Sequence, residues 1–204
     1  NKQKQVDDAP FGGGMGMIVQ AQPVYDCFKA VESTGDGQKP YVIYMSPQGK
    51  TLSQKKALEL SKKPWLVLLC GHYEGVDERV LEEIVDEEVS IGDYVLTGGE
   101  LPALVLADTV ARLVPGVLSS EECFTEESHF SGLLEYPQYS RPRVWKGREV
   151  PEVLLSGHHL NIKKWRRRQS LERTLKKRPE MLEKAELSKE DLEYIEKLRT
   201  ENNR

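Results

Sequence analysis

Long hydrophobic runs are missing from this sequence of 204 residues, and cysteine is scarce. The longest uninterrupted apolar run covers only residues 65–70, whereas a membrane-spanning helix needs about 20 residues, so we expect no membrane partner. The three cysteines, at positions 27, 70 and 123, have neither CxxC spacing nor metal-ligand spacing with histidine. We therefore expect free thiols in the cytoplasm and no metal site.

Two further deficits concern composition and the start of the chain. With 16 glycines and 11 prolines, the sequence is neither collagen-like nor of low complexity. No signal peptide pattern opens it, and its first residue is Asn1 rather than Met, so we expect an N-terminal piece to precede it.

Positive charge is unevenly distributed. The net charge is −4, yet residues 163–178 contain nine Lys or Arg and one acid, which leaves −12 for the rest of the chain. Such a run is often only a solvated helix face. Because it interrupts an acidic protein and includes Trp165, we favour contact with the phosphates of a nucleic acid.

Hydrophobic patterning predicts strands that alternate with helices in the first half. Expected strands are residues 17–20, 41–45, 65–70 and 88–91, of which 65–70 should be the most buried, and residues 46–49 should form a turn. Expected helices begin near Pro23, after a Ser53 cap and near Asp77. This alternation is typical of an α/β domain with a largely parallel sheet.

The character changes in the second half. Residues 100–114 form an apolar helix that belongs in a core or a subunit interface. Polar residues 119–131 indicate a linker between a domain of residues 1–118 and one of residues 132–204. In the latter, residues 132–151 should be extended and residues 161–177 and 190–201 helical, with a Ser188–Asp191 cap signal.

Glycine-bearing loops are the main candidates for a ligand site. Segments 46–49, 71–75 and 91–99 follow expected strands, and ligands of open α/β sheets bind at such ends. With no Lys or Arg inside them, these loops suit an adenosine-like ligand better than a bare phosphate, although they also fit ordinary βα turns. The run 12–16 lacks a preceding strand and the Lys of a P-loop, so it reads equally as a flexible turn.

Two side chains are candidates for catalysis. Arg112, the one cation of the apolar helix, can pair locally with Asp108 or stabilise charge on a substrate oxygen. Glu127, in the linker, is either a solvated acid or a general base that substrate binding orders.

Seven motifs together closely resemble the bacterial tRNA (guanine-N1)-methyltransferases, the TrmD family. They are VDDAPFGGGMGM (6–17), SPQG (46–49), GHYEGVDER (71–79), SIGDYVLTGGELPA (90–103), YSRP (139–142), LSGHH (155–159) and WRRRQ (165–169).

This resemblance implies a SPOUT-type α/β fold with a trefoil knot, a small helical C-terminal domain that grips tRNA, and a homodimer with active sites at its interface. It implies methylation of N1 of the guanine 3′ of the anticodon (nucleotide 37) in tRNA, with S-adenosyl-L-methionine as donor. The expected donor-binding residues are Tyr44, Met45, Ser46, Pro47, Gln48, Gly71, Tyr73, Glu74, Ile91, Gly92, Tyr94, Leu96, Gly98, Gly99 and Pro102. The expected tRNA-binding residues are Gly13, Gly14, Gly16, Lys163, Lys164, Trp165, Arg166, Arg167 and Arg168.

The sequence departs from the family at two places. The family's first strand and helix do not precede residue 6, and Glu127 stands before Ser128 where the family has an aspartate general base. By this resemblance we assign Glu127 as the general base and Arg112 as the group that stabilises negative charge on O6 of the guanine. Glu74 is assigned to offset the positive charge on the sulfur of S-adenosyl-L-methionine. Two alternatives remain: a SPOUT methyltransferase with another target nucleotide, and a non-catalytic RNA-binding protein.

Overall fold

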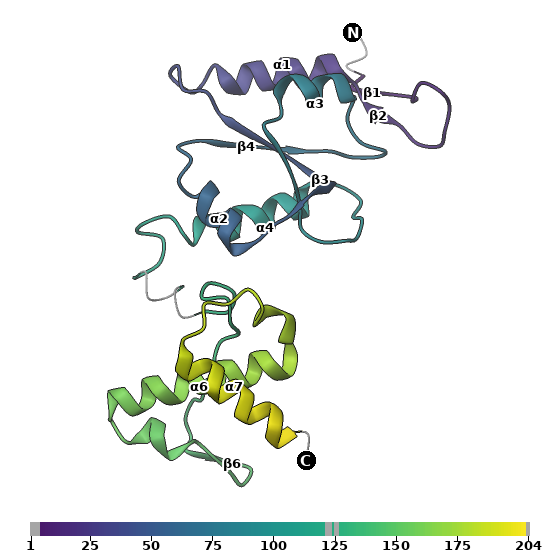
Figure 1. The fold of residues 1–204 in the computed structure, drawn as a ribbon. Helices are drawn as coiled ribbons and strands as arrows, with labels where there is room; N and C mark the ends of the chain where they lie inside the picture. Colours follow the sequence, from purple (N-terminus) through teal and green to yellow (C-terminus); the bar gives the residue numbers. More distant parts are fainter. Residues whose placement is uncertain (1–4, 121–123, 125–126, 203–204) are drawn as a thin grey trace. The chain divides into compact units, whose positions relative to one another are not determined.

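A computed structural model describes residues 5–120, 124 and 127–202 (Figure 1). The chain divides into two compact units, Asn1–Ser119 and Ser120–Arg204. Part of the expected linker, and Cys123, lie outside the described residues. Within the described part of the chain, no helix is long and apolar enough to cross a bilayer.

A parallel three-stranded sheet forms the centre of the first unit. Its strands are β3 (Tyr41–Thr51), β4 (Leu66–Cys70) and β5 (Glu87–Ser90), in the order β4-β3-β5. Met45 of β3 pairs with Cys70 and with Val89, so all three strands approach one edge of the sheet together. The predicted α/β class and parallel sheet are confirmed.

Strand β3 is longer than the sequence predicts. We expected a turn at residues 46–49, but the strand continues to Thr51. Its register shifts there, because Met45 and Lys50 both pair with Val89, so residues 46–49 are extra residues that bulge from the ladder. Pro47 has no N–H to donate to a ladder, and the Gln48 N–H donates to the Ser46 hydroxyl instead (3.1 Å).

Helices cover both faces of the sheet (Figure 1). Helices α1 (Ala21–Glu32) and α3 (Glu78–Ile84) pack together on one face, and α2 (Gln54–Leu60) and α4 (Glu100–Ala111) on the other. The predicted Ser53 cap is confirmed, since its hydroxyl accepts from the Lys56 N–H at 3.2 Å, and Asp77 caps α3 in the same way.

The expectation that residues 65–70 form the most buried strand was wrong. Strand β4, predicted to be the most buried, is half-buried along its whole length, whereas residues 42–46 of β3 are buried. The reason is the strand order, since β3 lies between its two neighbours and β4 has a sheet partner on one side only.

A short hairpin precedes the first helix. Strands β1 (Asp7–Asp8) and β2 (Ile18–Val19) pair antiparallel and enclose the glycine run. The prediction that no strand precedes this run was wrong, because β1 has only two residues and is defined by its pairing with β2. The Glu74 N–H donates to the Met17 carbonyl (3.0 Å), which ties the hairpin to the loop after β4.

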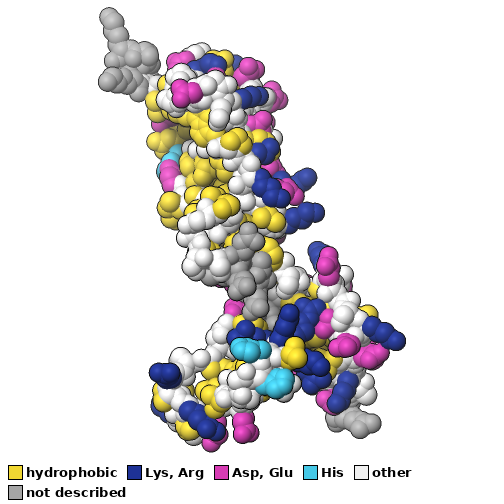
Figure 2. Space-filling model, turned by 90° about the vertical axis from the view of Figure 1, so that its left-hand side faces the viewer, with side chains coloured by type: hydrophobic (Ala, Val, Ile, Leu, Met, Phe, Trp, Pro, Cys, Tyr) yellow, Lys and Arg dark blue, Asp and Glu magenta, His cyan; other side chains and the backbone are white. Residues whose placement is uncertain are grey.

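Helix α4 has two apolar sides with different surroundings. It begins after Gly99, so Pro102 lies in the first turn, as predicted. Its inner side is buried and includes Leu106, whereas Leu101 and Leu104 on its outer side are more than 60% exposed. In Figure 2, hydrophobic side chains gather over part of this first unit.

The second unit is mainly helical. It contains β6 (Val144–Trp145), β7 (Arg148–Glu149), α6 (His159–Lys177) and α7 (Lys189–Asn202), with short 3₁₀ turns at Glu152–Leu155 and Pro179–Met181. Both predicted helices are confirmed, whereas the segment expected to be extended also contains the β6–β7 hairpin. The small core is formed by Leu133, Leu171, Leu182 and Ile195.

Candidate functional site

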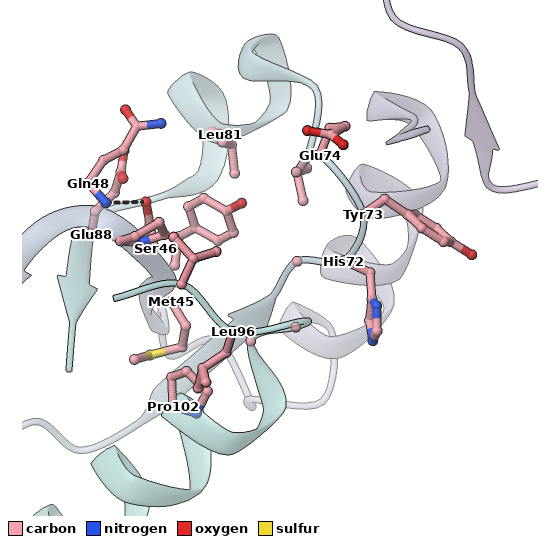
Figure 3. A pocket seen from close by; sticks show the side chains of 18 of the residues that line it. Met45, Ser46, Gln48, His72, Tyr73, Glu74, Leu81, Glu88, Leu96 and Pro102 are labelled. Atoms are coloured by element: carbon pink, nitrogen blue, oxygen red, sulfur yellow. Dashed lines mark hydrogen bonds between the residues drawn. The ribbon is translucent and has the colours of Figure 1, made fainter. Parts of the chain in front are cut away.

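A cavity of about 700 Å³ opens at the edge of the sheet where the three strands end (Figure 3). Its walls are the β3 bulge, the loop after β4 and the loop after β5. Figure 3 shows Met45, Leu96 and Pro102 gathered on one side, with Gln48 and Glu88 on another. This volume is in the range of sites for cofactor-sized ligands.

All fifteen residues that we expected at a donor site line this one cavity, although β3, β4 and β5 bring them from distant parts of the chain. Their role in binding a donor stays a prediction. The fifteen are Tyr44, Met45, Ser46, Pro47, Gln48, Gly71, Tyr73, Glu74, Ile91, Gly92, Tyr94, Leu96, Gly98, Gly99 and Pro102.

Backbone contacts join the loop after β4 to the loop after β5. The Gly99 N–H donates to the Gly71 carbonyl (2.9 Å), and His72 forms an antiparallel bridge with Gly98. The His72 Nε2 atom also lies 2.9 Å from a carboxylate oxygen of Glu100, the first residue of α4. A Cβ at position 99 would lie 2.8 Å from the Cys70 Cα, so only glycine permits this approach.

The cavity wall carries excess negative charge. Among the residues that the structure describes, its lining includes Glu74, Asp77, Glu78 and Glu88 and one cation, Arg79. The Arg79 guanidinium is paired with Asp77 at 2.7 Å. Such a wall favours a ligand that bears positive charge over a phosphate.

Two weak acids, the buried Tyr44 phenol in the cavity wall and the half-buried Cys70 thiol just before Gly71, are neutral at pH 7. Burial, with a smaller contribution from the charge of Glu88, raises the pKa of the Tyr44 phenol. Burial, with a smaller contribution from Glu100, likewise raises the pKa of the Cys70 thiol. A Cβ at position 71 would lie 2.8 Å from the Tyr44 hydroxyl oxygen, so a larger residue there would displace this ring.

The glycine run lies beside the cavity. Gly13, Gly14 and Gly16 all have positive φ, and a Cβ at Gly16 would lie 2.6 Å from the Glu74 side chain. Phe11, from the same hairpin, lines the cavity and is fully exposed. Phe11 was not predicted as a site residue, although an aromatic side chain directly before a glycine run is a signal that the sequence contains.

The two catalytic candidates belong to different units. Arg112 is the C-cap of α4, where its backbone N–H donates to the Asp108 carbonyl (3.2 Å), and it is half-buried. Glu127 is half-buried in the second unit, and its backbone N–H donates to the Phe124 carbonyl (3.2 Å). That these side chains act together stays a prediction.

The basic run lies on α6, and its members differ in their surroundings. Lys163, Lys164 and Arg168 are exposed. The Arg168 guanidinium lies over the Tyr194 ring (5.3 Å), and the Trp165 ring lies 6.4 Å from that of Tyr139. Arg166 lies over the Tyr136 ring, with 4.6 Å between the guanidinium carbon and the ring centroid. In Figure 2, Lys and Arg side chains gather on the second unit beside histidine.

Arg167 has a structural role in this unit. Its guanidinium donates to both carboxylate oxygens of Asp191, at 3.2 and 2.8 Å, and so fastens α6 to α7. The Asp191 carboxylate, 9% exposed, also accepts from the Ser188 N–H (2.9 Å), while the Asp191 N–H donates to the Ser188 hydroxyl (3.2 Å). The predicted cap is confirmed, with a cation added from 24 residues away.

Replacing Asp191 with asparagine is expected to destabilise the chain by about 2 kcal/mol, because a charged hydrogen-bond network loses its acceptor charge. Urea unfolding of the full chain measures this. The control is Glu201→Gln, which removes an exposed pair with Lys197 (3.8 Å) and should cost less than about 0.5 kcal/mol.

The Asp191 carboxylate should also make the stability of the folded chain depend on pH. The Arg167 hydrogen bonds hold the pKa of Asp191 below its ordinary value. The stabilisation from Asp191 is therefore complete above the pKa that this carboxyl has in the unfolded chain, about 3.9. It is lost as the pH falls through the lower pKa that Asp191 has in the folded chain. Equal destabilisation by Asp191→Asn and Glu201→Gln would contradict the role given to this pair.

Comparisons with known proteins found a matching family model and similar curated proteins. Residues 1–184 match the family model described as tRNA (Guanine-1)-methyltransferase TrmD. A curated protein of Ruminiclostridium cellulolyticum, named tRNA (guanine-N(1)-)-methyltransferase, is 67% identical over 184 residues, which are 90% of this chain and 78% of that protein. Proteins with the same name from Alkaliphilus oremlandii and Moorella thermoacetica are each 54% identical, over 98% and 97% of this chain and 82% and 79% of their own lengths.

Proposed function

This chain belongs to the tRNA (guanine-1)-methyltransferase family TrmD, and we propose on that premise that it transfers a methyl group to N1 of a guanine in tRNA. We take the target to be the guanine immediately 3′ of the anticodon, and the cytoplasm, where tRNA is used, as the location. The predicted family resemblance is confirmed by the match over residues 1–184.

The observation that carries this proposal is the acidic cavity at the strand ends. S-adenosyl-L-methionine, the proposed donor, presents a methyl group on a positively charged sulfur beside a polar nucleoside. The acidic lining suits that charge, and Glu74 is our candidate for offsetting it. The glycine-bearing loops bring backbone close to the proposed nucleoside site, and Met45, Leu96 and Pro102 offer apolar contact.

We also propose that the loops around the cavity form the trefoil knot of the SPOUT fold. The support is the backbone contact between segments 70–72 and 98–100, which are brought together against the end of β4. A glycine at position 99 permits this close approach, since a Cβ there would lie 2.8 Å from the Cys70 Cα.

The proposed chemistry assigns one task to each catalytic candidate. N1 of guanine carries a proton at neutral pH and is a poor nucleophile until that proton leaves. The Glu127 carboxylate accepts the proton, while the Arg112 guanidinium stabilises the negative charge that develops on O6. A sulfonium donor held by the cavity residues would supply the methyl group to N1 and would leave as the neutral thioether. The Gly13–Gly16 segment gives room for a base that has left its stack.

A homodimer is the proposed working form. Outer residues of α4, Leu101 and Leu104, are 62% and 65% exposed, and Val95 in the preceding loop is 80% exposed. Apolar side chains grouped in this way mark an interaction surface. Because they adjoin the cavity loop, a second copy of the chain seated there would border the donor site.

Tight tRNA binding is attributed to the exposed cations of α6. We expect that changing Lys163 and Lys164 to glutamine weakens tRNA binding and lowers the slope of log affinity against log salt by about 1.5, because two phosphate contacts are lost. The control variant, with Lys39 and Lys62 changed to glutamine, has the same net charge and should keep the wild-type slope. Equal slopes for the two variants would show that the α6 lysines face solvent and do not contact tRNA phosphates.

The function is tested by mapping the methyl group on a tRNA transcript after incubation with S-adenosyl-L-methionine. Mass spectrometry should find one methyl on N1 of the guanine 3′ of the anticodon, and none when that guanine is replaced by adenine. A methyl at another nucleotide would indicate a different SPOUT specificity. No transfer, with intact tRNA binding, would indicate a non-catalytic RNA-binding protein.

A further inference from the structure

The β6–β7 hairpin of the second unit is a small element with an exposed aromatic residue. Val144 pairs with Glu149 and Trp145 with Arg148, and the two strands are joined by Lys146 and Gly147. Both joining residues have positive φ, +50° and +75°, as a tight two-residue hairpin turn requires. A lysine is an unusual occupant of such a position, which favours glycine, asparagine or aspartate.

The hairpin carries excess positive charge. Residues 141–149 include Arg141, Arg143, Lys146 and Arg148 against the single acid Glu149, and every residue of this segment is exposed. Neither the catalytic proposal nor the α6 cations account for this charge.

Trp145 is 58% exposed and stands outside the cluster that forms the core of its unit. The Lys146 ammonium lies 5.1 Å from the centre of its ring. An exposed indole beside a tight turn, with cations on both flanks, matches the arrangement by which proteins bind unpaired nucleotides. In such sites, aromatic rings stack on bases and cations contact phosphates.

We propose that the β6–β7 hairpin is a separate RNA contact, in which Trp145 stacks on an unpaired base and the flanking arginines and Lys146 bind the adjoining phosphates. This inference rests on the proposed function, since it takes tRNA as the partner. It differs from the α6 contact in kind, because stacking requires a base outside a continuous duplex, whereas phosphate contact does not.

The first test compares two RNAs. Trp145→Ala should weaken binding of the full chain to an unmodified tRNA transcript by roughly 5- to 100-fold, the range for loss of one base–aromatic stack. Its affinity for a blunt RNA duplex should change by less than about twofold, because stacked bases are closed to the indole. Trp145→Phe should recover most of the loss.

The matched control is Val144→Ala. Val144 is 48% exposed and adjacent, but successive strand residues point to opposite faces, so its loss should leave both affinities unchanged. Trp145→Ala affinity for tRNA within twofold of wild type would overturn the proposal. Equal losses for tRNA and duplex would also overturn it, since phosphate contact alone would then explain the effect.

A second measurement does not depend on removing Trp145. With Trp65 and Trp165 changed to phenylalanine, Trp145 becomes the sole tryptophan, and adding tRNA should quench its fluorescence while the duplex should not. An unchanged signal at saturating tRNA would contradict stacking. Wild-type methyl transfer reports on the proposed function separately, so a negative result at the hairpin leaves that function standing.

Discussion

Replacing Arg112 with alanine is expected to lower kcat for methyl transfer by about 10²–10³-fold, the usual loss when one donor to a developing oxyanion is removed. The effect should fall on kcat because the charge on O6 exists only as the N1 proton leaves. Arg112→Lys should recover part of the loss, since lysine keeps the charge but not the planar guanidinium. Single-turnover assays with radiolabelled donor measure this step.

Donor affinity is the control for this variant. Arg112 does not line the cavity, so calorimetric binding of S-adenosyl-L-methionine should stay near the wild-type value. Near-normal turnover of Arg112→Ala would refute the proposed role. A matching loss of donor affinity would instead assign Arg112 to the shape of the cavity, which the C-cap position on α4 could influence.

Changing Gly99 to alanine is expected to weaken donor binding and to lower the rate of methyl transfer by about 100-fold. The new Cβ would lie 2.8 Å from the Cys70 Cα and 3.0 Å from the Gly71 nitrogen, and a backbone cannot move aside as a flexible side chain can. The loops after β4 and β5 must then separate, and displacements of about 1 Å at a reacting site can cost about 10²-fold in rate.

Gly37→Ala is the matched control for Gly99→Ala. Gly37 lies in the loop before β3 with φ +84°, and its Cβ would meet nothing within 4 Å. This variant therefore reports the general cost of losing a glycine, which should appear as lower stability with unchanged donor affinity. Similar donor affinities for the two variants would show that the contact between the two loops does not shape the site.

Features set by local chemistry were predictable from the sequence. Ser53 caps α2 and Ser188 pairs reciprocally with Asp191, because a short polar side chain next to free N–H groups decides where a helix begins. The position of Pro102 likewise predicted where α4 begins, because proline is tolerated in the first turn of a helix. The convergence of the three loops on one cavity followed from parallel strands, which end at one edge.

Features that depend on distant partners were not predictable. The bulge in β3 exists because Met45 and Lys50 share one partner on β5, and β1 exists only through its pairing with β2. Arg167 reads as one cation of a run, yet its partner Asp191 lies on another helix. Burial of β4 depends on strand order, which hydrophobicity alone does not reveal.

The account depends most on the ligand of the cavity at the sheet edge, and a crystal grown with S-adenosyl-L-homocysteine, the demethylated donor, tests it directly. The account predicts this molecule between the β3 bulge and the loops after β4 and β5, with a second copy of the chain against the outer side of α4. A cavity filled by the chain's own side chains, with the donor analogue bound elsewhere and α4 facing solvent, would contradict it.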